Sequence, residues 1–209
     1  MIANVYIDGF NFYYGCIKGT PHRWLNFSRL FTYIFKNVTI NHIRYFTAKV
    51  SPTADDPSIH TRQLMYLRAL GTLPNLSIHL GTFRSDSVPM RLVTPLPDGT
   101  DTATVRRTQE KGSDVNLASH LLLDGFRKDY EMAIIVTNDS DLVSPIQMVC
   151  NDLGLKAGIL NPQKGFNNSL KNIPNLLFYI PIHSSALRKN QFPRVLTDSK
   201  GSFYKPKAW

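Results

Sequence analysis

Residues 3–11 read Ala-Asn-Val-Tyr-Ile-Asp-Gly-Phe-Asn, a short apolar run that stops at an acid and a glycine. The run at 5–7 is typical of a buried strand, and Asp8-Gly9 is a turn signal, so we expect a strand that ends at Asp8. No glycine-rich phosphate loop follows this strand. Sites for dinucleotides and for nucleotide hydrolysis are therefore poorly supported.

Apolar runs and helical patterns alternate along the rest of the chain. We expect further strands at 39–47, 76–83, 132–137, 155–160 and 176–180, and helices at 25–36, 58–71, 113–128, 141–152 and 166–172. Asn26 or Ser28 can cap the first of these helices, and Ser113 can cap the third. Strands that alternate with helices predict an α/β fold with a mostly parallel sheet covered by helices on both faces.

Two segments depart from this alternation. Residues 84–111 are rich in Pro, Gly, Ser and Thr, and we expect a long functional or mobile loop there, in which a hairpin can turn at Pro97-Asp98-Gly99. From Phe192 onward the chain is rich in Pro, Lys and Ser, which indicates a flexible basic tail. We therefore expect one domain over residues 1–182, followed by a basic extension over residues 183–209.

Length and charge limit the possible functions. The 209 residues suffice for one α/β domain, and the net charge is +9, although nine acids stand against five basic residues between 101 and 152. This distribution suits either a polyanion partner together with a cation site, or general solubility. No apolar run is long enough for a membrane span, and the N-terminus does not read as a signal peptide. We expect a cytoplasmic chain in which Cys16 and Cys150 stay reduced.

Four aspartates stand where an α/β fold gathers ligands. Asp8 ends the first strand, Asp139 and Asp141 directly follow the strand at 132–137, and Asp114 opens a helix. Ligands of open parallel sheets bind beyond the carboxyl ends of the strands, where the strand order reverses. If the first strand and the strand at 132–137 are neighbours there, the acids converge.

Converging carboxylates repel one another unless a cation neutralises them, and hard oxygen ligands favour Mg²⁺ or Mn²⁺ over zinc. Such a site can hydrolyse phosphodiester bonds. Each acid also has a simpler interpretation: Asp114, Asp139 and Asp141 can be helix caps, and Asp8-Gly9 can be a turn. The residues alone leave both interpretations open.

Three motifs in this order resemble the NYN domain family of the PIN-like nuclease superfamily. They are Val5-Tyr6-Ile7-Asp8-Gly9-Phe10-Asn11, Lys111-Gly112-Ser113-Asp114-Val115-Asn116-Leu117-Ala118 and Val136-Thr137-Asn138-Asp139-Ser140-Asp141-Leu142. The resemblance covers residues 2–182. It implies a three-layer Rossmann-like fold and a Mg²⁺- or Mn²⁺-dependent ribonuclease site. The metal and catalytic positions that it implies are Asp8, Asp114, Asp139 and Asp141, supported through hydrogen bonds by Asn11 and Asn138.

One position departs from the family pattern. Many members carry a further aspartate six residues after the position of Asp114, where this chain has His120. His120 is either a neutral ligand or a histidine on the face of the helix. Ser140 can cap the following helix or bond a carboxylate, and Lys111 can pair with Asp114, contact phosphate or remain a solvated loop lysine.

Basic and aromatic residues near the acids are candidates for contacts with RNA. Arg106 and Arg107 precede Asp114 in the loop, so we expect them near the scissile phosphate, whereas the basic tail adds non-specific affinity. Tyr13 and Tyr14 can stack on unpaired bases or belong to the core.

The sequence therefore predicts a metal-dependent endoribonuclease. The alternative is a non-catalytic RNA-binding or adaptor module with the same fold. The sequence does not decide whether the chain forms a homo-oligomer.

Overall fold

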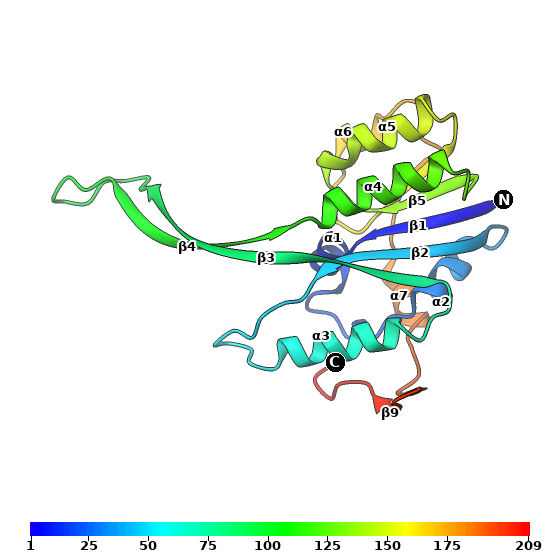
Figure 1. The fold of residues 1–209 in the computed structure, drawn as a ribbon, viewed down its shortest axis with the longest axis horizontal. Coiled ribbons are helices and arrows are strands. Elements are labelled where there is room, and N and C mark those ends of the chain that lie inside the picture. Colours follow the sequence, from blue (N-terminus) through cyan, green and yellow to red (C-terminus); the bar gives the residue numbers. More distant parts are fainter.

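In the computed structural model, which describes residues 1–209, β1 (Ile2–Asp8) lies at the middle of a seven-stranded sheet with the order β4-β3-β2-β1-β5-β6-β7 (Figure 1). The other strands of this sheet are β2 (Thr39–Ala48), β3 (Leu76–Arg91), β4 (Thr102–Lys111), β5 (Met132–Val136), β6 (Lys156–Asn161) and β7 (Phe178–Pro181). Neighbouring strands are parallel except for the antiparallel pair β3–β4. The expected α/β fold with a mostly parallel sheet is confirmed.

Helices connect these strands. They are α1 (Gly9–Phe12), the π-helical turn η1 (Tyr13–Ile17), α2 (Phe27–Ile34), α3 (Ile59–Leu70), α4 (Ser113–Phe126), the 3₁₀ turn η2 (Ser140–Leu142), α5 (Val143–Asn151), α6 (Asn168–Lys171) and α7 (Ser184–Lys189). Two short antiparallel strands, β8 (Val195–Asp198) and β9 (Gly201–Tyr204), complete the chain. Residues 168–171 form a helix inside the range expected at 166–172.

The strand order reverses between β1 and β5. The chain runs outward through β2 and β3, then returns so that β5 pairs with β1 in parallel, from Ala3 opposite Met132 to Ile7 opposite Val136. The carboxyl ends of β1 and β5 therefore lie side by side. This is the place at which open α/β sheets bind their ligands.

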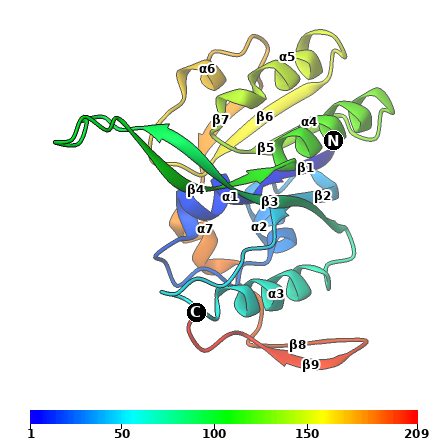
Figure 2. The ribbon, with the colours of Figure 1, turned by 60° about the vertical axis from the view of Figure 1, so that its left-hand side comes forward.

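Two hydrophobic layers hold the helices against the sheet. Successive strand residues point to opposite faces, so Val5 and Ile7 pack in the core under α2, α3 and α7, whereas Tyr6 packs in the core under α4 and α5. Figure 2 shows the two groups of helices on the two faces of the sheet. β5 is buried along its whole length, as expected for a central parallel strand covered on both faces.

The segment expected as a loop is a long two-stranded arm. The first half of β3 pairs with β2, but from Thr82 to Arg91 it pairs only with β4, and this ribbon projects from the body (Figure 1). The prediction of a loop was wrong for 84–91 and 102–111, which pair as strands with many Ser, Thr and Arg residues in water, and only residues 92–101 connect them without regular strand structure. The predicted turn at Pro97-Asp98-Gly99 is confirmed: Gly99 has a positive φ of 88° and donates its N–H to Leu96 O.

The C-terminal extension belongs to the hydrophobic core. Leu187, Phe192 and Phe203 are buried in the cluster that contains Trp24, whose Nε1 donates to Pro193 O at 2.8 Å. Arg68 of α3 forms a bidentate ion pair with Asp198. The prediction of a flexible tail was wrong, because its few apolar residues have partners far away in the sequence.

Two smaller predictions concern helix caps and cysteines. Asn26, not Ser28, caps α2 by accepting from Arg29 N, and Gly112, not Ser113, is the N-cap residue of α4. Cys16 and Cys150 are free, as predicted. No helix has both the length and the apolar composition that a membrane crossing requires.

Candidate metal centre

Asp8 is the last residue of β1 and is 6% exposed. Its Oδ1 accepts the backbone N–H of Asn11 at 2.9 Å and so caps α1, and its Oδ2 accepts the hydroxyl of Thr137 at 3.0 Å. Burial raises the pKa of Asp8 to about 6, helped by the charges of Asp114 and Asp139 and opposed by these hydrogen bonds. Asp8 is therefore a buried, oriented carboxylate with acidic neighbours.

Asp139 is held by the loop that follows β5. Its backbone N–H donates to Thr137 Oγ1 at 3.1 Å, and its Oδ1 accepts the N–H of Asp141 at 3.0 Å, which caps η2. The simpler interpretation of Asp139 as a cap is therefore correct for one of its oxygens. The other oxygen remains available to a ligand.

Asp114 lies in the first turn of α4 and is half-buried. The preceding Gly112 has a φ of 99°, a left-handed conformation that a glycine adopts without strain. Glu110 closes this turn from β4, because its carboxylate accepts from both the N–H and the hydroxyl of Ser113. Burial raises the pKa of Asp114, and the charges of Asp139, Glu110 and Asp141 raise it further.

These three carboxylates converge. Asp8, Asp114 and Asp139 each present an oxygen, and the three oxygens lie within 4.8 Å of one another. None of the three forms an ion pair with a lysine or an arginine. A cluster of oxygen ligands without a basic partner suits a hard divalent cation such as Mg²⁺ or Mn²⁺. Asp141 is exposed and lies outside this group of three, although it is close enough to affect Asp114, so its role as a ligand stays a prediction.

A polar network supports the loop after β5. Asn138 donates its backbone N–H to Asn11 Oδ1 at 3.1 Å, so the two predicted supporting residues contact each other. Gln163 Nε2 donates to Asn11 O, while Asn167 Nδ2 donates to Asn138 O and the hydroxyl of Tyr179 donates to Asn138 Oδ1. Sequence reasoning missed these last three residues and Thr137. Thr137 and Gln163 lie just after the carboxyl ends of β5 and β6, a signal that could have found them, whereas Asn167 caps α6 and Tyr179 lies within β7.

A comparison with known protein families places most of the chain in one of them. The model of the NYN domain matches residues 3–181. The chain belongs to the NYN domain family. Membership in this family, which is part of the PIN-like nuclease superfamily, supports a nuclease-type function that generally depends on divalent metals.

Two individual proteins are similar to this NYN chain. A curated protein of Pseudomonas putida (strain DSM 28022 / S16), 6-hydroxy-3-succinoylpyridine 3-monooxygenase HspA, is 32% identical over 236 aligned positions, which cover 99% of this chain and 75% of that protein. The crystal structure of a protein of unknown function from Vibrio parahaemolyticus RIMD 2210633 superposes with a TM-score of 0.51 at 18% identity, covering 87% of this chain and 92% of that one. The second likeness supports the α/β fold alone.

Two of the predicted supporting residues lie at the rim of the NYN site. Lys111 is exposed at the end of β4, where its partner in the strand register is Thr82. Ser140 is exposed at the start of η2, and the side chain that caps this turn is that of Asp139. The roles that the sequence suggested for Lys111 and Ser140 stay predictions.

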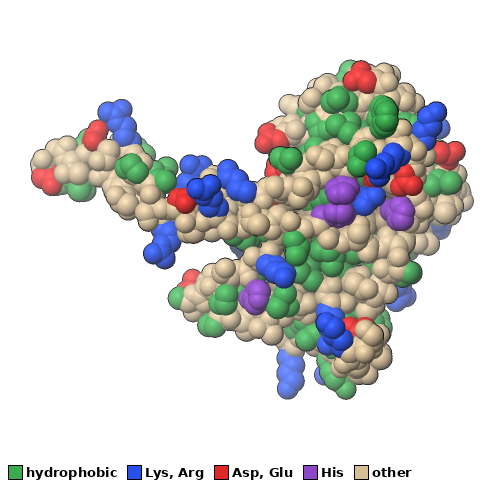
Figure 3. Space-filling model, viewed as in Figure 1, with side chains coloured by type: hydrophobic (Ala, Val, Ile, Leu, Met, Phe, Trp, Pro, Cys, Tyr) green, Lys and Arg blue, Asp and Glu red, His purple; other side chains and the backbone are tan.

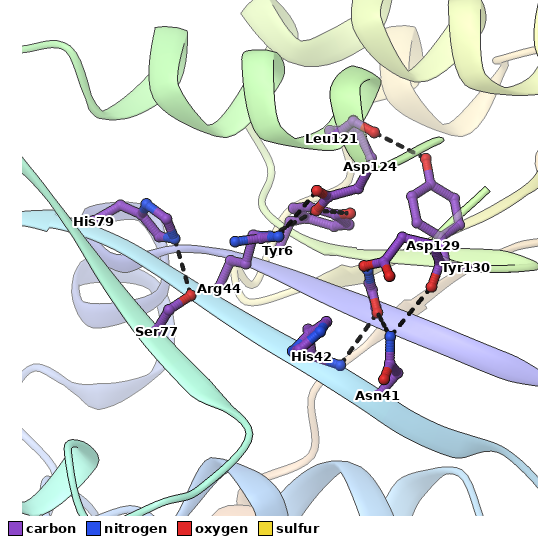
Figure 4. A network of polar contacts seen from close by, with 11 residues as sticks. Tyr6, Asn41, His42, Arg44, Ser77, His79, Leu121, Asp124, Asp129 and Tyr130 are labelled. Atoms are coloured by element: carbon purple, nitrogen blue, oxygen red, sulfur yellow. Dashed lines mark hydrogen bonds and ion pairs between the residues drawn. The ribbon is translucent and has the colours of Figure 1, made fainter. Parts of the chain in front are cut away.

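His120 lies in a second polar cluster, outside the group of three carboxylates. Its ring centroid is 4.2 Å from that of His79 and 5.8 Å from that of Phe46. Figure 4 shows the adjoining network, in which Arg44 forms a bidentate pair with Asp124 beneath α4. Burial lowers the pKa of His120, and the charge of Arg44 lowers it further. His120, at which the chain departs from the NYN pattern, therefore packs against the sheet and lies outside the group of three carboxylates.

Arg106 and Arg107 lie on the arm, four to five residues from its base. Neighbouring strand residues alternate between faces, so the two side chains point to opposite sides of the ribbon. The face of Arg106 is also that of Glu110 and of Phe83, whose ring lies 5.6 Å from that of Phe10 in α1. Arg106 therefore lies on the face of the ribbon that, at the base of the arm, is turned toward the group of three carboxylates. Figure 3 shows Lys and Arg side chains gathered along the arm near the body.

Tyr13 and Tyr14 follow α1 and form an edge-to-face pair with ring centroids 5.3 Å apart. Tyr13 packs against the core, whereas Tyr14 is 60% exposed. Both tyrosines line a cavity of about 370 Å³, whose lining also includes Gly9, the residue after Asp8. Their contact with bases stays a prediction.

Proposed function

We propose that this NYN protein is a Mg²⁺- or Mn²⁺-dependent endoribonuclease that hydrolyses phosphodiester bonds of RNA. The observation that carries the proposal is the convergence of Asp8, Asp114 and Asp139 from three separate elements at the reversal of the strand order. Family membership independently supports a nuclease-type function.

The donor set of the site suits the expected metal. All of the grouped ligands are carboxylate oxygens, and a cation would relieve the repulsion that contributes to the raised pKa of Asp8. When bound, the metal supplies positive charge that stabilises the phosphate oxygens and activates the attacking water.

The protein residues position these ligands. Thr137 and the N–H of Asn11 hold the two oxygens of Asp8, and Thr137 also holds the backbone of Asp139. The two acids are therefore fixed relative to each other before a substrate binds. Such preorganisation is the protein's main contribution to phosphoryl chemistry.

Charge outside the site attracts the substrate. The chain carries a net charge of +9, and the exposed arginines of the arm, Arg84, Arg106 and Arg107, lie beyond the acidic cluster. Arg84 is paired with Asp86 in the structure, which leaves Arg106 and Arg107 as the stronger candidates for phosphate contacts.

The test is cleavage of labelled single-stranded, structured and transfer RNAs. We expect cleavage with Mn²⁺, loss of cleavage in EDTA, and recovery when Mn²⁺ is added back. Asp139→Asn should abolish cleavage and the rise in melting temperature that Mn²⁺ causes, whereas Asp152→Asn, an exposed acid after α5, should change neither. Full activity of Asp139→Asn in Mn²⁺ contradicts the proposal. RNA binding without any cleavage favours the non-catalytic RNA-binding alternative.

A second candidate function rests on two observations. The similar monooxygenase aligns with almost the whole chain, and the lining of an aromatic cavity includes Gly9, the residue after Asp8. Oxygenation of a heteroaromatic ring would consume O₂ and a two-electron reductant, with one oxygen atom entering the ring and the other leaving as water. Uptake of O₂ with 6-hydroxy-3-succinoylpyridine and a reduced nicotinamide, together with no cleavage of RNA, would favour this candidate.

A further inference from the structure

A cavity lies on the α3 side of the sheet, between α1, η1 and the C-terminal residue. Its volume is about 370 Å³, which is in the lower part of the range for small-molecule sites, roughly 300 to 1,000 Å³. Aromatic side chains form much of its wall; they include Phe10, Tyr13, Tyr14, Tyr45, Tyr66 and Trp209. Cavities of this size and lining typically accept one planar ring with a substituent.

The polar groups of the cavity are mainly cationic. Lys18, Arg23 and Arg62 line it, and Arg62 is neutralised by an ion pair with Asp56. The ammonium of Lys18 lies 4.9 Å from the centre of the Tyr14 ring. Neither Lys18 nor Arg23 forms an ion pair with a carboxylate, so an anion in the cavity would meet two cations that have no counter-charge.

The chain passes directly from the metal centre to the cavity wall at the junction of β1 and α1. Gly9 lines the cavity and is bonded directly to Asp8. A Cβ at Gly9 would lie 2.5 Å from Phe46 O and 3.0 Å from the ring of Tyr45. The side chain of Tyr45 in the cavity wall therefore packs directly against the backbone of Gly9. A ligand seated against Tyr45 therefore lies beside the end of β1 that carries Asp8.

We propose that this cavity binds a planar aromatic ring that carries an anionic group, with the ring between the aromatic side chains and the anion at Lys18 and Arg23. A purely apolar ligand would leave the charges of Lys18 and Arg23 without a counter-charge, and a simple anion would leave the aromatic walls unfilled. The ligand is either a nucleotide unit of RNA or a small heteroaromatic acid. The nucleotide form rests on the proposed ribonuclease function, and the acid form does not.

Binding is measured in EDTA, so that the result does not depend on metal or on cleavage. The probes are uridine 5′-monophosphate, adenosine 5′-monophosphate and pyridine-3-carboxylate, with ribose 5-phosphate and uridine as controls that lack the ring or the anion. Calorimetry gives the affinity. The intrinsic fluorescence reports on the cavity, because the chain has two tryptophans, Trp209 in the wall and Trp24 with its ring 6.2 Å from that of Trp209.

Three variants test the location. Lys18→Ala removes an exposed cation and should weaken binding of the ring-bearing anions at least tenfold, whereas Lys36→Ala, an exposed lysine outside the cavity, should change nothing. Val50→Trp should abolish binding, because it fills the cavity from a segment without regular structure. Arg23→Gln should weaken the anionic probes more than uridine.

The results distinguish a nucleotide ligand from a small acid, and they also distinguish failure of the cavity proposal from failure of the ribonuclease function. Tighter binding of the nucleotides identifies a base of RNA, tighter binding of pyridine-3-carboxylate identifies a small acid, and either result supports the cavity. Binding of neither class, or binding that Lys18→Ala and Val50→Trp leave unchanged, overturns the proposal. If the probes bind but no RNA is cleaved, the ribonuclease function fails and the cavity stands. If RNA is cleaved with the same KM by Val50→Trp, the nucleotide form fails alone.

Discussion

The hydroxyl of Thr137 donates to Asp8 Oδ2 at 3.0 Å and joins the ends of β1 and β5 at the reversal of the strand order. The hydroxyl oxygen of Thr137 also accepts the backbone N–H of Asp139 at 3.1 Å. One buried side chain thus holds two members of the carboxylate group, which come from segments about 130 residues apart. Residues that orient metal ligands in this way affect metal affinity without contacting the metal.

Thr137→Val tests this role, since it removes the hydroxyl and keeps the shape of the side chain. We expect Mn²⁺ affinity to fall by about 10- to 100-fold and stability to fall by about 1–3 kcal/mol, because the N–H of Asp139 loses its acceptor. Calorimetric titration and urea unfolding measure the two effects. Thr137→Ser is the matched control and should keep most of the affinity. Equal losses in both variants would show that packing, not the hydroxyl, matters.

Asp8 should make the metal-free protein less stable as pH rises. Its folded-state pKa is raised to about 6, above the ordinary value, so the folded protein holds a proton that the unfolded chain has lost. This contribution to stability is present below about pH 4 and is lost as pH rises through about 6. In EDTA at pH 8, we expect Asp8→Asn to be more stable than the wild type by on the order of 2 kcal/mol.

Urea unfolding of both proteins at pH 4 and pH 8 in EDTA checks this expectation. The stability difference between Asp8→Asn and the wild type should be small at pH 4 and appear at pH 8. Asp152→Asn serves as the control, because its carboxylate is exposed and lies outside the group. A stability difference that does not change with pH would mean that the folded structure does not raise the pKa of Asp8.

The arm should contribute to RNA binding mainly through one of its faces. Arg106 shares the face that meets the carboxylates, and Arg107 points to the other side. We expect Arg106→Ala to lower the cleavage rate at saturating RNA more than Arg107→Ala does. Each lost phosphate contact should reduce the log–log salt slope of binding by about 0.7 for a single strand. Arg91→Ala, close to the tip of the arm, is the control, and an effect equal to that of Arg106→Ala would refute the orientation.

The C-terminal extension should stabilise the body of the protein. Phe203 is 3% exposed, and the guanidinium carbon of Arg68 lies 4.1 Å from the centre of its ring. We expect Phe203→Ala to cost about 3–5 kcal/mol of stability, as large-to-small changes of buried aromatics do. Tyr204→Ala, at a neighbouring residue that is 61% exposed, should cost little. Thermal unfolding compares the two, and similar melting temperatures would contradict the packing of this segment.

Local patterns predicted the main elements well, because each signal was contained within a few residues. The apolar run before Asp8 and the apolar run at 132–137 became β1 and β5. The same patterns indicated the turn of the arm but not the length of its strands, since these are largely exposed on both faces and show no sustained alternation of apolar and polar residues. Ser113 was expected to cap α4, but its hydroxyl is taken by Glu110, a contact that depends on the path of β4.

The amino-acid sequence by itself determined the α/β class, the order of the parallel strands and the main helices between them, and the acids at the strand ends, because these follow from short-range periodicity and turn chemistry. Only the tertiary structure decided which acids meet, since the pairing of β5 with β1 brings Asp139 to Asp8 and leaves Asp141 outside the group. It also decided the place of His120 beside His79 and the aromatic cavity that includes Trp209. These contacts join residues distant in the chain, and long-range packing, not local preference, selects them.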